Sequence, residues 1–186
     1  MKLGFVFRSM SDPFVVTDDL GDVRYTVTMP DYVEVLSLAD AGGTELAALT
    51  QAPEARRLRV RITGQDVADV RSRGQFNRQY WADTAGGRLR ALGSVYYGVY
   101  FLSPDSQVES AVARVERALN WTGSKTWVRL VIADNADPVL LTAIVLGMEY
   151  LCYSPTLGES LMRRGSAAAR TTVPSVRSPQ AAGGPQ

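Results

Sequence analysis

The sequence contains no histidine and only one cysteine, Cys152, among its 186 residues. Serine and cysteine hydrolases usually need a histidine as general base, and most zinc sites use histidine or several cysteines. These chemistries are therefore nearly excluded. Lysine is also scarce, because only Lys2 and Lys125 supply amines and neither lies in an apolar pattern. Mechanisms based on carboxylates, lysine or tyrosine stay open in principle, but the composition predicts a protein that is not an enzyme and has no cofactor or metal.

The single cysteine also indicates the compartment. Cys152 cannot form a disulfide within the chain, and its apolar neighbours predict that it is buried and inert. Residues 3–7 are followed by Arg8, which leaves an apolar stretch too short for an export signal. We therefore predict a cytoplasmic protein, with a peripheral position at the inner membrane face as a further option.

The net charge of +1 is unevenly distributed. Residues 163–186 contain four arginines and no acid, so their charge is +4 and the rest of the chain is at −3. Nucleic-acid binding is not predicted, since such proteins usually have a basic domain. Residues 161–186 are rich in Arg, Ser, Ala, Thr, Pro, Gly and Gln. This composition predicts a disordered basic tail, which could recruit a partner protein.

One apolar run, Pro138 to Tyr153, has a composition typical of a helix that is buried on every side. It has 16 residues, whereas a bilayer span needs about 20, and it contains Glu149. Asp137 precedes Pro138 as a residue able to cap a helix, and Ser154 and Pro155 would end that helix. A membrane insertion or a pair of core strands would be the alternatives. The flanking residues favour a buried core helix.

The chain before this run alternates between apolar and polar residues, as strands with one buried face do. Turns rich in Asp, Gly, Ser or Pro separate the members of each predicted hairpin. The paired segments are residues 14–16 with 24–27, 33–38 with 45–49, 58–62 with 66–73, 79–81 with 88–93 and 95–102 with 108–115, followed by a last strand at 127–132. Closure into a barrel would remove the sheet edges, and the helix could fill the interior. We predict a mainly β protein, a closed antiparallel β-barrel that encloses one hydrophobic C-terminal helix.

Three passages carry a resemblance to a known family. They are PFVVTDDLGDVRYTV at 13–27, VEVLSLADAGGTELAAL at 33–49 and VARVERALNWTGSKTWVRLVIADNADPVLLTAIVLGMEYL at 112–151. Together they resemble the tubby C-terminal-like superfamily, in particular its LURP-one-related and phospholipid-scramblase-like proteins. The match covers residues 1–153, and the order of elements carries it more than any short motif. The resemblance implies a barrel of about twelve strands in residues 1–160, wrapped around a helix at about 138–153.

The resemblance also implies relatives that bind phosphoinositides, take part in lipid movement or have no assigned activity. In scramblases an acidic segment before the helix is associated with calcium, and Asp134, Asn135 and Asp137 are the matching positions. This segment is short and lacks the six to eight oxygen ligands that calcium takes. Helix capping is therefore the favoured role. Glu149 stands where family members tend to carry Asp, and if buried it needs a partner or a raised pKa.

A candidate binding surface lies in the hairpin of residues 57–73. Its apolar residues have even numbers and its arginines odd ones, so an in-register hairpin places five guanidinium groups on the outer face. They belong to Arg57, Arg59, Arg61, Arg71 and Arg73, with Asp69 as the only opposing acid. Guanidinium groups bind phosphate in a bidentate manner, so we predict that this face meets anionic phospholipid headgroups. The alternative is an ordinary solvated sheet face.

Aromatic residues form a second group, and alternation divides them between core and surface. They are Tyr80, Trp81, Tyr96, Tyr97, Tyr100, Phe101, Trp121 and Trp127. Core packing is favoured over base stacking beside Arg88 and Arg90, because no RNA-binding motif accompanies them. Three functions remain: a non-enzymatic module that binds anionic phospholipid, a soluble scaffold that uses the basic tail, and a lipid scramblase. A single short apolar segment makes the scramblase the weakest of the three.

Overall fold

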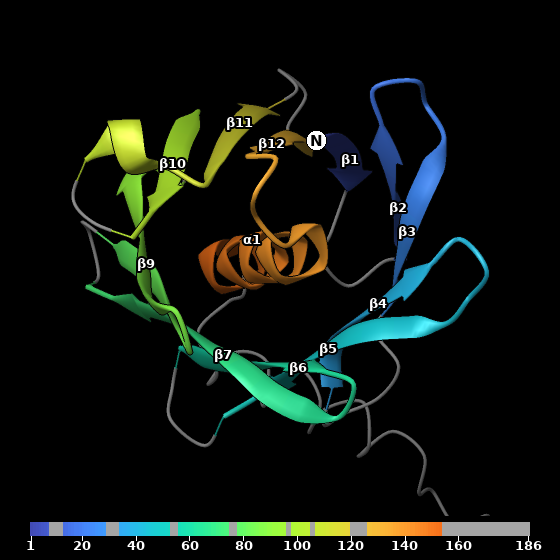
Figure 1. Cartoon of the computed structure of the whole chain (residues 1–186), viewed down its shortest axis with the longest axis horizontal. Coiled ribbons are helices and arrows are strands. Elements are labelled where there is room, and N and C mark those ends of the chain that lie inside the picture. The colour runs from blue at the N-terminus through green and yellow to red at the C-terminus, as the bar shows by residue number, and fades with distance from the viewer. Residues whose placement is uncertain are drawn as a thin grey trace, which may run out of the picture. The chain divides into compact units, whose positions relative to one another are not determined.

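The computed structural model describes residues 1–7, 13–28, 34–52, 56–74, 78–95, 98–104, 107–119 and 126–153. Twelve strands, one short 3-10 helix and one α-helix lie in these ranges (Figure 1). The elements are β1 Lys2–Phe7, β2 Phe14–Asp18, β3 Val23–Thr28, β4 Glu34–Asp40, β5 Glu45–Gln51, β6 Arg57–Ile62, β7 Gln65–Arg73, β8 Gln79–Thr84, β9 Gly87–Gly93, β10 Val99–Ser103, η1 Val108–Ser110, β11 Ala113–Leu119, β12 Thr126–Ile132 and α1 Pro138–Tyr153.

The strands form a closed barrel in which every strand runs antiparallel to its two neighbours. Strands β2 to β12 follow one another around the wall, and β1 lies between β12 and β2. The closing ladder extends from the pair Lys2 and Val131 to the pair Phe7 and Thr126. The predicted closed antiparallel barrel is therefore confirmed. Residues 2–7 were not identified as a separate strand from the sequence, because their apolar run is short and their longer ladder is with β12, far away in the chain, while only three residue pairs join them to β2.

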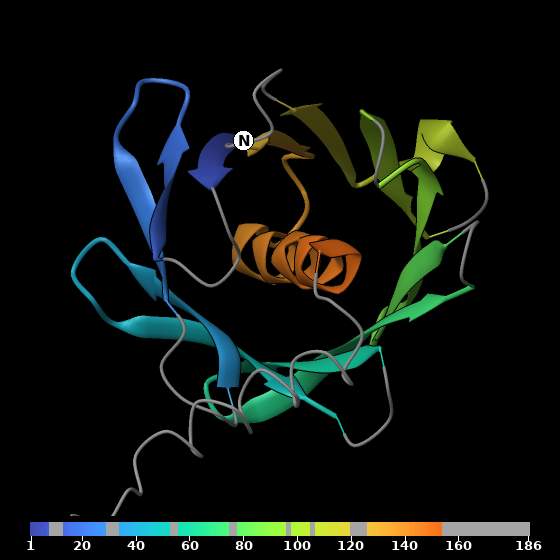
Figure 2. The ribbon, with the colours of Figure 1, turned by 180° about the vertical axis from the view of Figure 1, so that it is seen from behind.

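Helix α1 passes through the interior of the barrel, as the views from both ends show (Figures 1 and 2). Residues 141–149 are all buried, and α1 packs against β5, β6, β7, β8 and β12. Gly147 allows this close approach, because a Cβ atom there would lie 3.1 Å from Leu49 Cδ2 and 3.2 Å from Val70 Cγ2. The buried core helix is confirmed over the alternatives of a membrane insertion and a strand pair. No helix in the described ranges is long and apolar enough to cross a membrane.

Side chains form hydrogen bonds with the backbone groups at both ends of α1. Asp137 Oδ1 accepts hydrogen bonds from the backbone N–H groups of Val139 at 2.9 Å and Leu140 at 3.1 Å. This is the N-cap that the sequence predicts. At the other end, Arg78 Nη1 donates to the carbonyl oxygens of Leu151 and Cys152, both at 3.3 Å. The helix start and end are thus fixed by residues outside the apolar run itself.

The hairpin predicted at 95–102 and 108–115 is wrong in its boundaries. Strand β10 begins at Val99, and the chain makes the 3-10 turn η1 before β11 begins at Ala113. Val95 is buried but lies outside a strand, and its carbonyl oxygen accepts a hydrogen bond from Arg117 Nη1 at 2.6 Å. The predicted tail at 161–186 lies outside the described residues.

Candidate anion-binding site

The five arginines predicted as binding residues all lie on the outer surface of β6 and β7. The residues between them point inward, and Leu58, Val60 and Val70 are fully buried. Arg59 and Arg61 have side chains that are 44% and 40% exposed. The structure therefore brings the predicted residues together on one face, while their role in lipid binding remains a prediction.

The outer face is less positive than the sequence indicates, because a register shift adds an acid to it. The ladder between β6 and β7 shifts between Val60 and Arg61, so that Arg61 lies opposite Asp66. Asp66 consequently lies 3.8 Å from the Arg59 guanidinium and 3.9 Å from that of Arg61. The expectation that Asp69 is the only opposing acid was wrong, since alternation alone cannot reveal a β-bulge.

Asp69 neutralises Arg57 most strongly. Arg57 donates from Nε to Oδ1 at 2.9 Å and from Nη2 to Oδ2 at 2.8 Å, which is a bidentate pair. The hydrogen bonds from Arg57 lower the pKa of the Asp69 carboxyl, and the nearby Arg71 guanidinium contributes to the same effect. Arg57 is therefore the predicted residue with the least free charge for a ligand.

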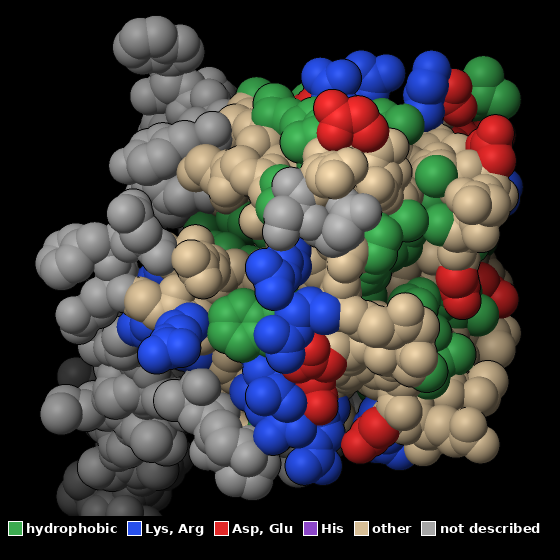
Figure 3. Space-filling model, turned by 60° about the vertical axis from the view of Figure 1, so that its left-hand side comes forward, with side chains coloured by type: hydrophobic (Ala, Val, Ile, Leu, Met, Phe, Trp, Pro, Cys, Tyr) green, Lys and Arg blue, Asp and Glu red, His purple; other side chains and the backbone are tan. Residues whose placement is uncertain are grey.

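The face extends beyond the predicted hairpin onto β8 and β9. Across the ladders, Arg71 lies opposite Trp81, and Trp81 lies opposite Arg90. Asp83 on β8 lies 3.6 Å from Arg71 Nε and 2.6 Å from Arg88 Nε. Figure 3 shows the resulting band of basic side chains, with acidic ones inside it.

We name this surface the arginine face and define it by the charged residues of β6–β9. It consists of Arg57, Arg59, Arg61, Arg71, Arg73, Arg88 and Arg90, with Asp66, Asp69 and Asp83. Seven cations against three anions leave a net charge of +4. The sequence analysis treated Arg88 and Arg90 only as neighbours of aromatic residues. Two signals in the sequence could have added Arg88 and Arg90 to this face. They alternate with Leu89, and they follow directly after a predicted hairpin turn.

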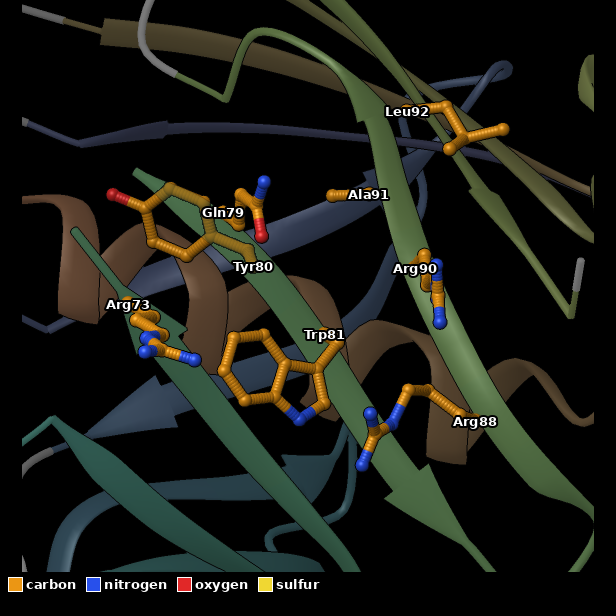
Figure 4. A pocket seen from close by; sticks show the side chains of 8 residues that line it. All are labelled: Arg73, Gln79, Tyr80, Trp81, Arg88, Arg90, Ala91 and Leu92. Carbon is orange, nitrogen blue, oxygen red and sulfur yellow. The ribbon is translucent and has the colours of Figure 1, made fainter. Parts of the chain in front are cut away.

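A hollow of about 350 Å³ opens at one end of the arginine face, between β8 and β9. The two strands pair from Trp81 and Arg90 to Thr84 and Gly87, and Gln79 has no partner on β9. Figure 4 shows the strands separating there. We call this the β8–β9 hollow; it is lined by Arg73, Gln79, Tyr80, Trp81, Arg88, Arg90, Ala91 and Leu92.

The cations of the hollow differ in how far they are already paired. Arg88 Nε donates to Asp83 at 2.6 Å, and its guanidinium carbon lies 5.5 Å from the centre of the Trp81 ring. Arg73 and Arg90 form no ion pair with any carboxylate in the described part of the chain. The indole Nε1 of Trp81 is buried and lacks a hydrogen-bond acceptor among the described residues. With respect to the described residues, the hollow thus contains two guanidinium groups, those of Arg73 and Arg90, that no carboxylate neutralises.

A separate polar cluster lies inside the barrel around Glu149, whose side chain is fully buried. The Tyr100 hydroxyl donates to Glu149 Oε1 at 3.3 Å, and Arg117 Nη2 lies 3.6 Å from Oε2. Burial raises the pKa of Glu149 to about 7, although Arg117 and the Tyr100 hydrogen bond act in the opposite direction. Burial and the neighbouring Glu149 also raise the pKa of Tyr100. Glu149 thus has both the partners and the raised pKa that the sequence analysis expects of a buried carboxyl at this position.

The acidic segment before α1 is used for capping and for a terminal contact. Asp137 caps the helix, and the exposed Asp134 lies 3.5 Å from the Met1 amino group. Among the described residues there is no group of three or more His, Cys, Asp or Glu side chains that could hold a metal ion. The calcium role that the scramblase resemblance suggests for this segment gains no support from its geometry.

Comparison with known proteins supports the fold. No family model and no curated protein matches this chain. Its structure is similar to an X-ray structure of a protein from Arabidopsis thaliana, with a TM-score of 0.55 and 16% sequence identity. The match covers 81% of this chain and 91% of the Arabidopsis protein. At this level of identity the likeness shows a similar fold and nothing about function.

Proposed function

We propose that this protein is a non-enzymatic β-barrel module that binds anionic phospholipid headgroups through its arginine face. We assign it to the tubby C-terminal-like superfamily, beside the LURP-one-related and phospholipid-scramblase-like proteins, on the order of its elements and its helix-filled barrel. In this proposal it works in the cytoplasm as a peripheral protein of the inner membrane face. The observation that carries the proposal is the net charge of +4 on four adjacent strands.

The strength of this interaction follows from the net charge. Each basic residue near an anionic leaflet is worth about 1 kcal/mol, so a net charge of +4 supplies about 4 kcal/mol. Such a free energy corresponds to a dissociation constant of about 1 mM. Binding through charge alone is therefore weak and reversible, and it is reduced by salt because exposed charges are screened within about 10 Å.

The test compares two pairs of arginines that have matched surroundings. Arg59 and Arg61 lie on the arginine face and share Asp66 at 3.8 and 3.9 Å. Arg114 and Arg129 lie on β11 and β12, across the barrel in Figure 1, and share Glu116 at 2.7 and 3.8 Å. Changing either pair to glutamine removes two positive charges from partly exposed side chains that share one acid.

The assay is flotation with vesicles of phosphatidylcholine alone or with added phosphatidylserine. We expect the wild type to float only with the phosphatidylserine vesicles. Arg59→Gln/Arg61→Gln should weaken this binding roughly 30-fold, because it removes about 2 kcal/mol. Arg114→Gln/Arg129→Gln should bind like the wild type. Equal recovery with both kinds of vesicle, or equal losses in the two variants, would contradict the proposal.

A further inference from the structure

We propose that the β8–β9 hollow is a binding site for a phosphate monoester, held between Arg73 and Arg90 beside the ring of Trp81. This inference deepens the proposed function, on which it rests, by naming the class of headgroup that the arginine face prefers. A phosphate monoester occurs both at the end of a lipid headgroup and in small soluble metabolites, and the hollow would recognise the same chemical group in either.

The hollow is formed by the path of β9. Arg90 is paired on one side with Trp81 and on the other with Ser103, whereas Ala91 and Leu92 are paired with β10 alone. Gly93 has a φ of 106°, and a Cβ atom there would lie 2.6 Å from the Val99 carbonyl oxygen. The end of β9 thus lies tightly against β10 and away from β8. The separation of β8 and β9 is therefore set by the strand pairing of the barrel.

The charge of the lining suits a doubly charged anion. Arg73 from β7 and Arg90 from β9 lie on either side of Trp81, as Figure 4 shows, and the lining contains no carboxylate. Two like charges across one hollow repel each other, and an anion between them removes this repulsion. A phosphate monoester carries a charge of about −1.5 to −2 at neutral pH, which matches two guanidinium groups better than the single charge of a phosphodiester.

Trp81 adds an aromatic surface to the hollow and a means of observing it. Its indole Nε1 lies on the Arg88 side of the ring and is closed off from solvent, so the N–H is a reporter of events at the ring and not a ligand for the phosphate (Figure 4). Arg88 itself is held by Asp83 and by the face of the Trp81 ring, so it extends the positive surface without being free to close on the ligand.

The volume limits the size of the ligand. The hollow measures about 350 Å³, near the lower end of the roughly 300–1,000 Å³ that small-molecule sites occupy. This is larger than a phosphate group alone and small for a nucleotide. Tyr80 lies at its inner side, where burial raises its pKa to about 12, so this residue stays neutral and adds no negative charge. The best ligand is a phosphate with a small polar group attached.

The first experiment uses two soluble probes, glycerol 3-phosphate as the monoester and glycerophosphocholine as the diester. Binding is followed by the indole N–H resonance of Trp81, assigned with Trp81→Phe. We expect the monoester to shift this resonance in a saturable way and the diester to bind roughly 10-fold more weakly or worse. Arg73→Gln/Arg90→Gln should reduce monoester affinity by a similar or larger factor, whereas Arg114→Gln/Arg129→Gln should leave it unchanged. Equal binding of the two probes, or full binding by Arg73→Gln/Arg90→Gln, overturns the inference.

The second experiment separates the lipid source from the soluble one and the inference from the proposed function. Vesicles containing phosphatidic acid are compared with vesicles of equal surface charge containing phosphatidylglycerol. Stronger flotation with phosphatidic acid, lost in Arg73→Gln/Arg90→Gln, supports a lipid headgroup in the hollow. Monoester binding in solution without any flotation supports the hollow and refutes the membrane function. Flotation that depends on Arg59 and Arg61, with no response of Trp81 to the monoester, refutes the hollow and leaves the membrane function in place.

Discussion

The buried carboxyl of Glu149 makes the stability of the barrel dependent on pH. Its side chain is fully buried, and its charged neighbour in the cluster is Arg117, with Tyr100 as a neutral donor. Burial raises the pKa from its usual 4.5 to about 7. The perturbation that isolates this effect is Glu149→Gln, because the amide keeps the shape and can still accept the Tyr100 hydrogen bond but cannot ionise.

The direction of the pH dependence follows from the pH at which the folded and the unfolded chain each release the Glu149 proton. Between pH 4.5 and about 7 the folded chain keeps the proton on Glu149, whereas the unfolded chain has lost it. The folded state therefore binds more protons in this window, and the free energy of unfolding falls as the pH rises. The stabilisation is complete below 4.5 and is lost as the pH passes about 7. One pKa unit is worth about 1.4 kcal/mol, so the total change is about 3 kcal/mol.

The assay is urea unfolding of the wild type and Glu149→Gln at several pH values between 5 and 8 at constant ionic strength. Other titrating groups are shared by both proteins and cancel in the difference between their free energies of unfolding. We expect the wild type to lose about 2.5 kcal/mol relative to Glu149→Gln across this range. A difference that does not change with pH, or one that grows in favour of the wild type, would refute the reasoning, because Arg117 would then outweigh the cost of burial.

Substitutions at three further positions test how the chain is held at particular backbone sites. Gly93→Ala should destabilise the barrel by about 3 kcal/mol or more, since its Cβ would lie 2.6 Å from the Val99 oxygen at a φ of 106°. Gly21→Ala, at a φ of 91° with open space around it, should cost only about 1 kcal/mol of backbone strain in the same thermal unfolding assay. Asp137→Ala should lower the free energy of unfolding by about 1 kcal/mol through loss of two cap hydrogen bonds, whereas Asp137→Asn should keep most of it. Equal effects of the two glycine changes, or of the two Asp137 changes, would contradict these assignments.

The barrel and its helix could be predicted from the sequence because each depends on local patterns. Alternation fixes which face of a strand is buried, as the run from Val128 through Leu130 to Ile132 on β12 illustrates. The apolar run and the capping Asp137 fix α1 to the residue. Strand β1 was not predicted as a separate element because its longer ladder is with β12, at the other end of the barrel sequence, and its ladder with the neighbouring β2 has only three residue pairs.

The candidate site was only partly predictable, because it depends on how strands are aligned with one another. The alternation of odd and even positions along β6 places Arg59 and Arg61 on the outer face. The shift in register between β6 and β7 after Val60, which brings Asp66 beside them, has no signal in the sequence. The β8–β9 hollow depends on where β9 leaves β8 for β10, which is a property of three strands together. Local patterns therefore locate the charges, while the register between strands decides which of them are neutralised.

The position of α1 determines when this protein can fold during its synthesis. The segment at the centre of the core, residues 138–153, leaves the ribosome after every strand that surrounds it. Strand β1 must also wait for β12, although it is made first. At about 5–20 residues per second, the nascent strands spend roughly 7–30 s with their apolar sides uncovered. The barrel consequently cannot close around its core until Tyr153 has been released, and until then the emerging chain exposes apolar surface of the kind that chaperones shield.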